Sequence, residues 1–553
     1  MDKQEGTKGV KRKEDPPRRR SPVSPPASLP SSSNGTLLEL DLARTGLACD
    51  LGAALPPLVE AAPRLRALDA SGNAVTGTPA ALAAALACAT SLQALDISQT
   101  ALAGPLADAC GLAAGGALRS LTALAAGLTG ALPACLAAAP GLQALHLDWN
   151  ELDGPLPELA PTLARFTAAR TPPGGGAAPA RGGFSGPLPA LPPSLALLDL
   201  TGHSLEGPLP DTLPAGLAEV RLAGNAVSGA LPPAWAARAL TVVDLSLNPL
   251  SGGLPPSWAN SSSIVRLALR GAGLGGDLPA DWLGAASLAA ADLAANAFTG
   301  ALPPALARLP ALRALDVSDN QLSEGLVQFA DAVPTGGSRL AFFDASRNAL
   351  AGAPLAAAAG LARLAIFAPA APQTASDAPP ARALALGGNA GLRGPFPAWL
   401  VDALTRLGEP APAGPTVALA DIKLTCPSGG FASPVARPTA TVALARAECA
   451  AADGHPTPVA TLLHAAPGGG GAYSVARPVA AALGGAALVA AAACALATAR
   501  RRGACAARPP PPRAFARFGD AASPTAGACA ALRVGAPGSD DKPTPRGGQG
   551  VGV

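Results

Sequence analysis

The sequence is poor in aromatic residues, histidine and methionine. Its 553 residues include 11 Phe, five Trp and one Tyr, together with four His and one Met. A core must therefore be built from aliphatic side chains of modest volume, which is not the composition of a compact, aromatic-rich enzyme.

Motifs for catalysis and for metal binding are missing as well. The sequence contains no H-E-x-x-H, no G-x-x-x-x-G-K-[ST] and no G-x-S-x-G. Its nine cysteines form no C-x-x-C pair, so zinc-knuckle, thioredoxin-like and haem-attachment sites lack their motif. We therefore predict no enzymatic activity, no catalytic residue, no metal site and no cofactor.

The formal net charge of +3 conceals two basic tails around an acidic body. Residues 1–20 hold eight Lys/Arg against four Asp/Glu, and residues 500–553 hold nine against three. Subtraction from the totals of 40 and 37 leaves 23 against 30 between the tails. A nucleic-acid-binding domain instead presents a basic patch or stripe, so we predict no nucleic-acid partner.

What the chain does contain is the recurring pattern L-x-x-L-x-L-x-x-N-x-L-x-G-x-L-P. Clear copies are LQALHLDWNELDGPLP at 142–157, LTVVDLSLNPLSGGLP at 240–255 and LAAADLAANAFTGALP at 288–303. The alignment gives about fifteen units, with starts near 37, 65, 92, 118, 142, 163, 195, 217, 240, 264, 288, 312, 340, 361 and 381. The pattern resembles the plant-type leucine-rich-repeat family over roughly 37–408. The resemblance implies an α/β solenoid, a leucine-rich-repeat horseshoe or superhelix with a parallel β-sheet on its concave face.

Each repeated position has a physical role. The spaced Leu residues of L-x-L share one face of a short strand and are buried when coils stack. The Asn at the ninth position can satisfy backbone groups of the adjoining turn. It is present as Asn73, Asn150, Asn225, Asn248, Asn296, Asn320 and Asn348. Thr45 and His203 replace it in two units, and we expect both to bond the same turn.

Two kinds of substitution bear on the core. In the unit that starts at Leu118, Ala123 and Ala126 replace the third Leu and the Asn, so this coil is expected to be among the least stable. Four tryptophans that follow L-P or F-P are interpreted as packing residues on the convex side, namely Trp235, Trp258, Trp282 and Trp399.

The residue between the two strand Leu points out of the sheet, so this position marks a line across the concave face. Eight units carry Asp there, whereas His146 and Arg221 interrupt the middle of the line. The acids are Asp41, Asp69, Asp96, Asp199, Asp244, Asp292, Asp316 and Asp344. An acidic concave stripe would attract cations or a basic partner. The alternative is that L-D-L belongs to the family consensus whatever the ligand.

A more local candidate site lies in two neighbouring units. His146, Asp148 and Trp149 come from one unit, and Arg165 and Arg170 come from the next. An exposed aromatic residue beside Arg is enriched in binding hot spots. The second unit also carries the Pro/Gly-rich insertion 171–183, and insertions often decorate the binding face of a repeat protein. The alternative is a Gly/Pro spacer beside which Trp149 covers a groove.

Segments outside the repeats predict further domains. Residues 1–36 are basic and then Pro/Ser-rich, which is typical of disorder, and they contain no signal peptide. Residues 409–477 are expected to form a C-terminal cap and a Gly-rich juxtamembrane linker. Residues 478–499 are 22 uncharged residues closed by three Arg, which predicts one transmembrane helix with the tail 500–553 in the cytoplasm. An Ala-rich tract outside any membrane is the alternative.

The cysteines leave two possibilities open. Cys110 and Cys135 occupy matching positions in adjacent coils and can pair, or they can remain reduced and buried. Cys426 and Cys449 bracket the segment after the last repeat and can staple a cap.

Two functions remain in view at this stage. The first is a membrane-anchored receptor-like protein without a kinase domain, which binds a protein, peptide or glycan ligand on its concave face and signals through a partner such as a co-receptor. The second is an intracellular scaffold, cytoskeletal or axonemal, that mediates protein–protein interaction in the cytoplasm. The segment 478–499 favours the receptor. For the missing signal peptide three explanations stay open: the natural start is a different one, the single helix directs insertion unaided, or the protein is intracellular.

Overall fold

The computed structural model describes residues 37–458, with gaps at 114–115, 171–181, 337, 353, 365–382, 396, 401–415, 420–421, 426–440, 444–447 and 451–455. The transmembrane segment proposed at 478–499 lies outside the described residues, as do both tails. Among the residues that are described, no helix has the length and apolar character needed to cross a bilayer.

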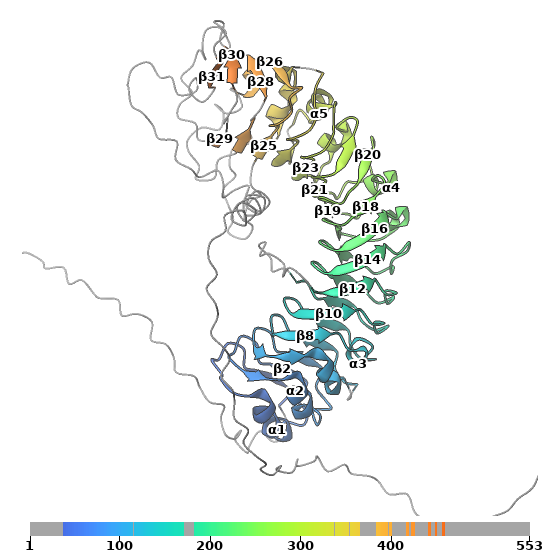
Figure 1. Ribbon diagram of the computed structural model, residues 1–553, viewed down its shortest axis with the longest axis vertical. Helices are drawn as coiled ribbons and strands as arrows, with labels where there is room; N and C mark the ends of the chain where they lie inside the picture. Colours follow the sequence, from blue (N-terminus) through green and yellow to red (C-terminus); the bar gives the residue numbers. More distant parts are fainter. Residues whose placement is uncertain are drawn as a thin grey trace, which may run out of the picture. The chain divides into compact units, whose positions relative to one another are not determined.

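Short parallel strands along the inner side of the stacked coils form one sheet of sixteen strands in the described part of the chain (Figure 1). Each strand is three residues long, and its middle residue is the first Leu of L-x-L or the residue that replaces it. In sheet order the strands are β1 (Glu39–Asp41), β2 (Ala67–Asp69), β4 (Ala94–Asp96), β7 (Ser120–Thr122), β9 (Ala144–His146), β11 (Arg165–Thr167), β13 (Leu197–Asp199), β15 (Glu219–Arg221), β17 (Val242–Asp244), β19 (Arg266–Ala268), β21 (Ala290–Asp292), β23 (Ala314–Asp316), β24 (Phe342–Asp344), β25 (Ala383–Ala385), β27 (Thr416–Ala418) and β29 (Thr441–Ala443).

A second set of strands follows the Asn position of the coils. Seven of them pair in the order β18 (Leu250–Ser251), β16 (Ala226–Ala230), β14 (Ser204–Pro208), β12 (Phe184–Pro187), β10 (Glu151–Pro155), β8 (Leu128–Ala131) and β6 (Gly104–Pro105). Smaller sheets pair β3 (Thr76–Gly77) with β5 (Ala101–Leu102) and β20 (Gly275–Asp277) with β22 (Ala297–Thr299). A four-stranded sheet joins β26 (Arg393–Pro395), β28 (Lys423–Thr425), β30 (Glu448–Ala450) and β31 (Pro456–Pro458).

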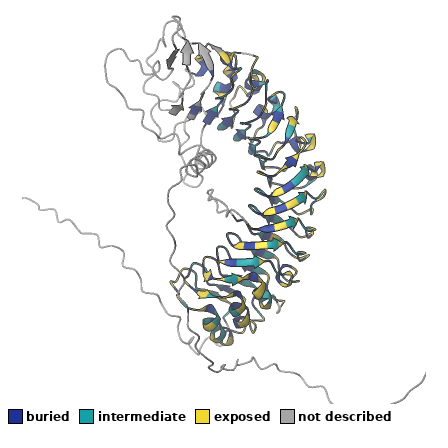
Figure 2. Cartoon of the chain, in the orientation of Figure 1, coloured by how far each residue is buried: buried dark blue, intermediate teal, exposed yellow. Residues whose placement is uncertain are grey.

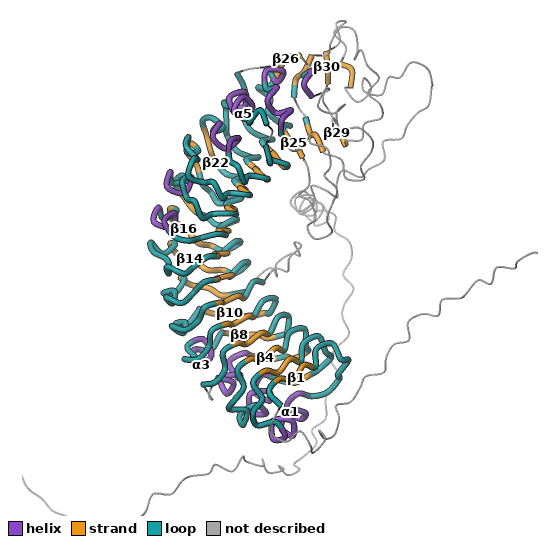
Figure 3. Tube along the Cα trace, turned by 180° about the vertical axis from the view of Figure 1, so that it is seen from behind, coloured by secondary structure: helices purple, strands orange, loops and turns teal. Residues whose placement is uncertain are grey.

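Helical turns return the chain to the next strand on the outer side of the coils (Figure 3). The α-helices are α1 (Leu51–Ala61), α2 (Pro79–Ala85), α3 (Ala134–Ala137), α4 (Pro256–Ala259) and α5 (Leu326–Ala332). The 3₁₀-helices are η2 (Leu106–Leu112), η3 (Pro233–Ala237), η4 (Pro304–Arg308), η5 (Leu355–Ala357) and η6 (Ala359–Arg363). The L-P ending explains where several of them begin, because proline fits the first turn of a helix, whose amide has no intrahelical partner.

The core is a continuous column of aliphatic side chains from neighbouring coils. Figure 2 colours the buried residues, which recur in coil after coil along the stack. Trp235, Trp258 and Trp282 are each at most 2% exposed, and Trp399 is 9% exposed, so all four predicted packing tryptophans are buried. The indole N–H of Trp258 donates to the Pro232 carbonyl of the preceding coil. The aromatic residues therefore reinforce contacts between coils on the convex side.

The ninth-position asparagines perform the predicted role. Asn150 donates from Nδ2 to the carbonyls of Ala123 and Leu147, at 2.6 and 2.9 Å. Its Oδ1 accepts from the amides of Ala126 and Leu128, both at 3.0 Å. One side chain thus satisfies backbone groups that the stack would otherwise bury unpaired. Asn389, which the repeat alignment overlooked, forms the same contacts one coil beyond Asn348.

Two boundaries of the predicted repeat are corrected. Leu361 lies in η6, and β24 pairs directly with β25, so the unit expected to start at 361 does not add a strand. In the other direction the inner sheet continues past 408 through β27 and β29.

The coil with Ala123 and Ala126 borders a small internal void. Ala123 and Leu121 line it together with residues of the preceding coils, and the lining is entirely apolar. Ala123 is fully buried beside this small apolar space, at a position where other coils hold a larger side chain.

The structure also decides the pairing of two cysteines. Cys110 and Cys135 form a disulfide with their Cα atoms 5.5 Å apart, so the reduced alternative is not what this structure contains. The side chains of Cys426 and Cys449 lie outside the described residues, and their proposed pairing stays a prediction.

Candidate functional site

The outward-facing positions of the inner sheet line up in one row across the coils because the parallel strands are in register. Asp41 pairs with Asp69, and Asp69 pairs with Asp96. The row then changes character, since Thr122 pairs with His146 and His146 with Thr167. It becomes mainly acidic again beyond Thr167, where Arg221 and Ala268 are the two exceptions among the acids Asp199, Asp244, Asp292, Asp316 and Asp344.

The acidic residues of this row have a structural task that explains their recurrence. All eight accept a hydrogen bond on Oδ1 from the amide two residues further on, at 2.8 to 3.2 Å. Asp96, for example, accepts from the amide of Ser98 at 2.9 Å. An Asp side chain that bonds its own backbone two residues on stabilises a turn at the strand end. The acids therefore have a role that needs no ligand.

Arginines from intervening coils neutralise part of the stripe. Arg221 approaches Glu219 at 2.6 Å and Asp199 at 3.9 Å, and Arg270 approaches Asp316 at 3.2 Å and Asp292 at 3.7 Å. These side chains are 17–39% exposed, so each pair is partly desolvated but still in contact with solvent. Two arginines therefore offset part of the negative charge of the stripe.

Burial still makes ionisation costly at several acids of the stripe. Desolvation, followed by the neighbouring charge of Asp316, raises the pKa of Asp292 to about 6. Desolvation likewise raises the pKa of Asp199 and of Asp344. Asp319, by contrast, has its pKa lowered by a hydrogen bond from Arg347.

The candidate site at the middle of the row is a hydrogen-bond network across two coils. His146 Nδ1 lies 3.0 Å from Thr167 Oγ1, which donates to Asp148 Oδ2 at 2.6 Å. Asp148 Oδ1 accepts from the amide of Ala169 in the same neighbouring coil. Desolvation by burial lowers the pKa of His146, and Arg165 lowers it further, whereas Asp148 and Asp96 raise it. Three polar side chains are thus held in one arrangement at the surface of the sheet.

Trp149 and Arg165 flank this network. Arg165 is exposed at the first position of β11. Trp149 is half-buried and adopts a left-handed backbone conformation with φ of +62°. The equivalent Leu247 has φ of +55° and is 63% exposed, so this position of the coil turns its side chain away from the core.

Arg170 is placed differently from the expectation of an exposed ligand contact. It is 8% exposed, and its guanidinium donates to the carbonyl of Gly182. Gly183, at φ of +104°, leaves no room for a side chain, because an added Cβ would lie 3.0 Å from Arg170 Nη1 and 2.8 Å from His203 Nδ1. Arg170 therefore holds the described end of the insertion in place, and residues 171–181 lie outside the described residues.

His203 makes the hydrogen bonds that the ninth-position Asn, the ladder Asn, makes in other coils. Its Nδ1 accepts from the amide of Phe184 at 3.0 Å, and its Nε2 donates to the carbonyl of Ala168 at 2.7 Å. Its ring stacks on Phe184 with centroids 4.7 Å apart. Burial lowers the pKa of His203 to about 4, so the ring is neutral in the folded protein.

Thr167 and Arg270 were not singled out from the sequence. Thr167 occupies the row position next to His146, and reading down that position would have found it. Arg270 stands two residues beyond its strand. The row takes only the residue between the two Leu of each coil, so it does not include that position.

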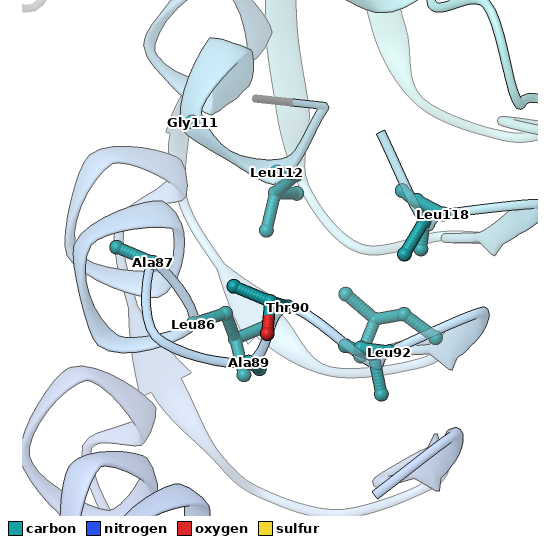
Figure 4. A pocket seen from close by; sticks show the side chains of 10 residues that line it. Leu86, Ala87, Ala89, Thr90, Leu92, Gly111, Leu112 and Leu118 are labelled. Atoms are coloured by element: carbon teal, nitrogen blue, oxygen red, sulfur yellow. The ribbon is translucent and has the colours of Figure 1, made fainter. Parts of the chain in front are cut away.

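A shallow pocket elsewhere is lined almost entirely by residues with apolar side chains. It lies between the end of α2 and η2, and Figure 4 shows aliphatic side chains such as Leu86, Leu92, Leu112 and Leu118 around it, with Thr90 supplying a hydroxyl. No charged residue lines it. In the part of the chain that the structure describes, no group of three or more His, Cys, Asp or Glu side chains is arranged to hold a metal ion.

Comparisons with known proteins agree with this architecture. The family model Leucine Rich Repeat matches residues 239–261. The structure of the Arabidopsis receptor kinase HAESA, in complex with the peptide hormone IDA and the co-receptor SERK1, is similar with a TM-score of 0.53 and 23% identity. The alignment covers 70% of this chain but 63% of that one, so the chain spans less than two thirds of its length. A leucine-rich-repeat protein of Leptospira interrogans is similar at 18% identity and a TM-score of 0.48, covering 71% of this chain and 93% of that one. No curated protein matches the chain.

The stacked strands, the Asn ladder and the family match together define a leucine-rich-repeat solenoid. The chain therefore has a leucine-rich-repeat fold, and its G-x-L-P coils resemble the plant-type pattern.

Proposed function

We propose that this chain is a non-catalytic recognition protein that binds a peptide segment along its concave face, centred on His146, Asp148, Trp149 and Arg165. The observation that carries the proposal is the break in the row of outward-facing residues. At that break a hydrogen-bonded group of three polar side chains spans two coils beside a half-buried Trp and an exposed Arg. A preformed polar group with a flanking aromatic residue is the composition of a binding hot spot.

The choice of a peptide rests on the shape of the face and on a structural likeness. A sheet of three-residue strands offers a long, shallow row of side chains, which suits an extended chain better than a small molecule that needs an enclosed pocket. The HAESA receptor kinase, which has a similar fold, is known in complex with a peptide hormone and a co-receptor. That likeness supports a peptide ligand and a protein partner as the classes to test.

The test uses the full chain and a peptide selected on it from a random display library. Replacing Trp149 and Arg165 with Ala is expected to weaken binding of that peptide by at least tenfold, because hot-spot residues carry most of the affinity. The melting temperature should fall by no more than ~2 °C, as for other surface substitutions. Arg170 is left intact because it is buried.

The matched control is the pair Leu247→Ala and Arg266→Ala. Leu247 holds the coil position of Trp149, and Arg266 holds that of Arg165 in β19. Full binding by the control and loss by the first variant support the site. Equal binding by both variants rejects the site and leaves the fold untouched.

We further propose that residues 478–499 anchor the chain in a membrane, with the repeats outside the cell or in a lumen. The support is the sequence alone: 22 uncharged residues are closed by Arg500, Arg501 and Arg502. An alkaline carbonate wash of cell membranes should leave the full chain in the pellet and release a variant that lacks 478–499. Complete release of the full chain would favour the scaffold function.

A further inference from the structure

The network at the break in the row determines where the protons lie. A carboxylate only accepts hydrogen bonds, and a threonine hydroxyl has one proton to give. Thr167 Oγ1 lies 2.6 Å from Asp148 Oδ2, so its proton is directed at Asp148. The hydroxyl oxygen then has only lone pairs to offer to His146.

This leaves one role for the nearer nitrogen of His146. Nδ1 is 3.0 Å from Thr167 Oγ1, and a hydrogen bond between them requires that Nδ1 carry the proton. A neutral imidazole has one protonated and one bare nitrogen. Because burial lowers the pKa of His146, the neutral ring is favoured and Nε2 is left as an acceptor.

We propose that His146 is a hydrogen-bond acceptor of fixed tautomer on the concave face, whose Nε2 binds a neutral donor, a hydroxyl or an amide N–H, of a peptide ligand. Thr167 is the positioning residue that selects this tautomer, and Asp148 orients Thr167. The tautomer follows from the contacts themselves, whereas the peptide as its ligand rests on the proposed function. In the described part of the chain, the hydrogen bond found for the His146 ring is the one between Nδ1 and Thr167.

A second histidine, two coils further along the stack, provides a contrast inside the same molecule. His203 accepts on Nδ1 from the amide of Phe184 and donates from Nε2 to the carbonyl of Ala168. The two histidines are therefore expected to hold opposite tautomers. His203 is buried in the ladder, while His146 is half-exposed on the face.

Charges of both signs surround the neutral ring of His146. Arg165 on β11 lowers its pKa, while Asp148 beyond its own strand and Asp96 on β4 raise it. The strands on either side contribute Thr122 and Thr167 in register, which carry no charge. Acidification would protonate Nε2 and convert the acceptor into a donor, so affinity for the peptide should decrease as the pH is lowered.

The tautomer can be measured without any ligand. The full chain is labelled with ¹⁵N-histidine, and the ring nitrogens are observed by two-bond ¹H–¹⁵N correlation at neutral pH, with His146→Gln and His203→Asn variants for assignment. His146 should show a protonated Nδ1 and a bare Nε2, and His203 should show the reverse. A protonated Nε2 on neutral His146 overturns the proposal.

Substitution at Thr167 tests the cause. Thr167→Val removes the hydroxyl and should let His146 move toward the Nε2–H tautomer, whereas Thr167→Ser should preserve the wild-type pattern. Thr122→Val, which changes the residue in register on the opposite side, is the control. An unchanged His146 spectrum in Thr167→Val contradicts the positioning role, and if that variant does not fold, the wild-type spectrum still decides the tautomer.

The ligand part is tested with the library-selected peptide. Thr167→Val and His146→Gln should each weaken its binding by roughly three- to tenfold, the effect of one neutral hydrogen bond, and Thr167→Ser should bind normally. A confirmed tautomer with unchanged binding in both variants rejects the acceptor role alone. Loss of binding only in the Trp149 and Arg165 variant keeps the proposed function and removes His146 from it.

Discussion

At the scale of single residues, His203 shows how a solenoid accommodates a substitution in its ladder. Both ring nitrogens replace the amide contacts of an Asn, at 3.0 and 2.7 Å from Phe184 N and Ala168 O. The sequence predicted a polar group that bonds the same turn, and the contacts confirm it. The substitution has a consequence that Asn lacks, because the ring can be protonated and the buried site opposes it.

His203 is therefore expected to destabilise the fold in acid. Its pKa is about 4 in the folded chain, against an ordinary histidine pKa of 6.5. The unfolded chain takes up the proton first as pH falls, so stability is complete above pH 6.5 and is lost progressively toward pH 4. Between pH 7.5 and 4.5 the loss should be about 2–3 kcal/mol.

The measurement is urea unfolding of the full chain and of His203→Asn at both pH values. Asn should keep the ladder bonds and remove this part of the pH dependence, so between pH 7.5 and pH 4.5 the full chain should lose about 2–3 kcal/mol more stability than His203→Asn. Other titrating groups, including Asp292, are common to both and cancel. The same pH dependence in both chains would show that His203 is not the titrating group.

The candidate site was predicted from single residues in part. The alternation of side chains along a strand places residues 146 and 165 outside the sheet, and the structure agrees. Arg170 did not follow, because it stands just before the insertion and does not share the positive φ of Trp149 and Leu247. Thr167 carries neither charge nor an aromatic ring, so a search for hot-spot residue types passes over it.

At the scale of elements, local spacing predicted most strands of the inner sheet. The L-x-L core position dictates a strand because its Leu residues must be buried by the next coil, as Leu145 and Leu198 are. The prediction failed where residues match the repeat spacing but do not form a strand, and where a strand lacks the expected Leu. Leu361 and Leu364 match the repeat but are buried in and beside η6. Strands β27 and β29 are built on Val417 and Val442, and their units were not recognised.

Neighbouring coils are also joined by contacts that no single repeat specifies. The Cys110–Cys135 disulfide links η2 to α3 across 25 residues of sequence. Matching positions in adjacent coils made the pair possible, but the choice between thiols and a disulfide needed the structure. Arg270 spans two coils to reach Asp316, which again depends on the stacking geometry rather than on one repeat.

At the scale of the whole molecule, the fold separates stability from recognition. Leu, Asn and Asp recur because the coil requires them for its core, its ladder and its turn. Positions on the concave face that serve neither the core, the ladder nor the turn can differ from one solenoid to another. In this chain the break at His146 and Thr167 is such a place, and that is why the proposed function is centred there.

The most direct test is hydrogen exchange of the full chain with and without the library-selected peptide. Bound peptide should slow backbone exchange around β7, β9 and β11 and leave β19 and β21 unchanged, because only the former flank the proposed site. The same experiment on the Trp149 and Arg165 double-alanine variant should show no protection. Protection confined to the convex helices, or to the coils around β19 and β21, would contradict recognition at the break in the concave row.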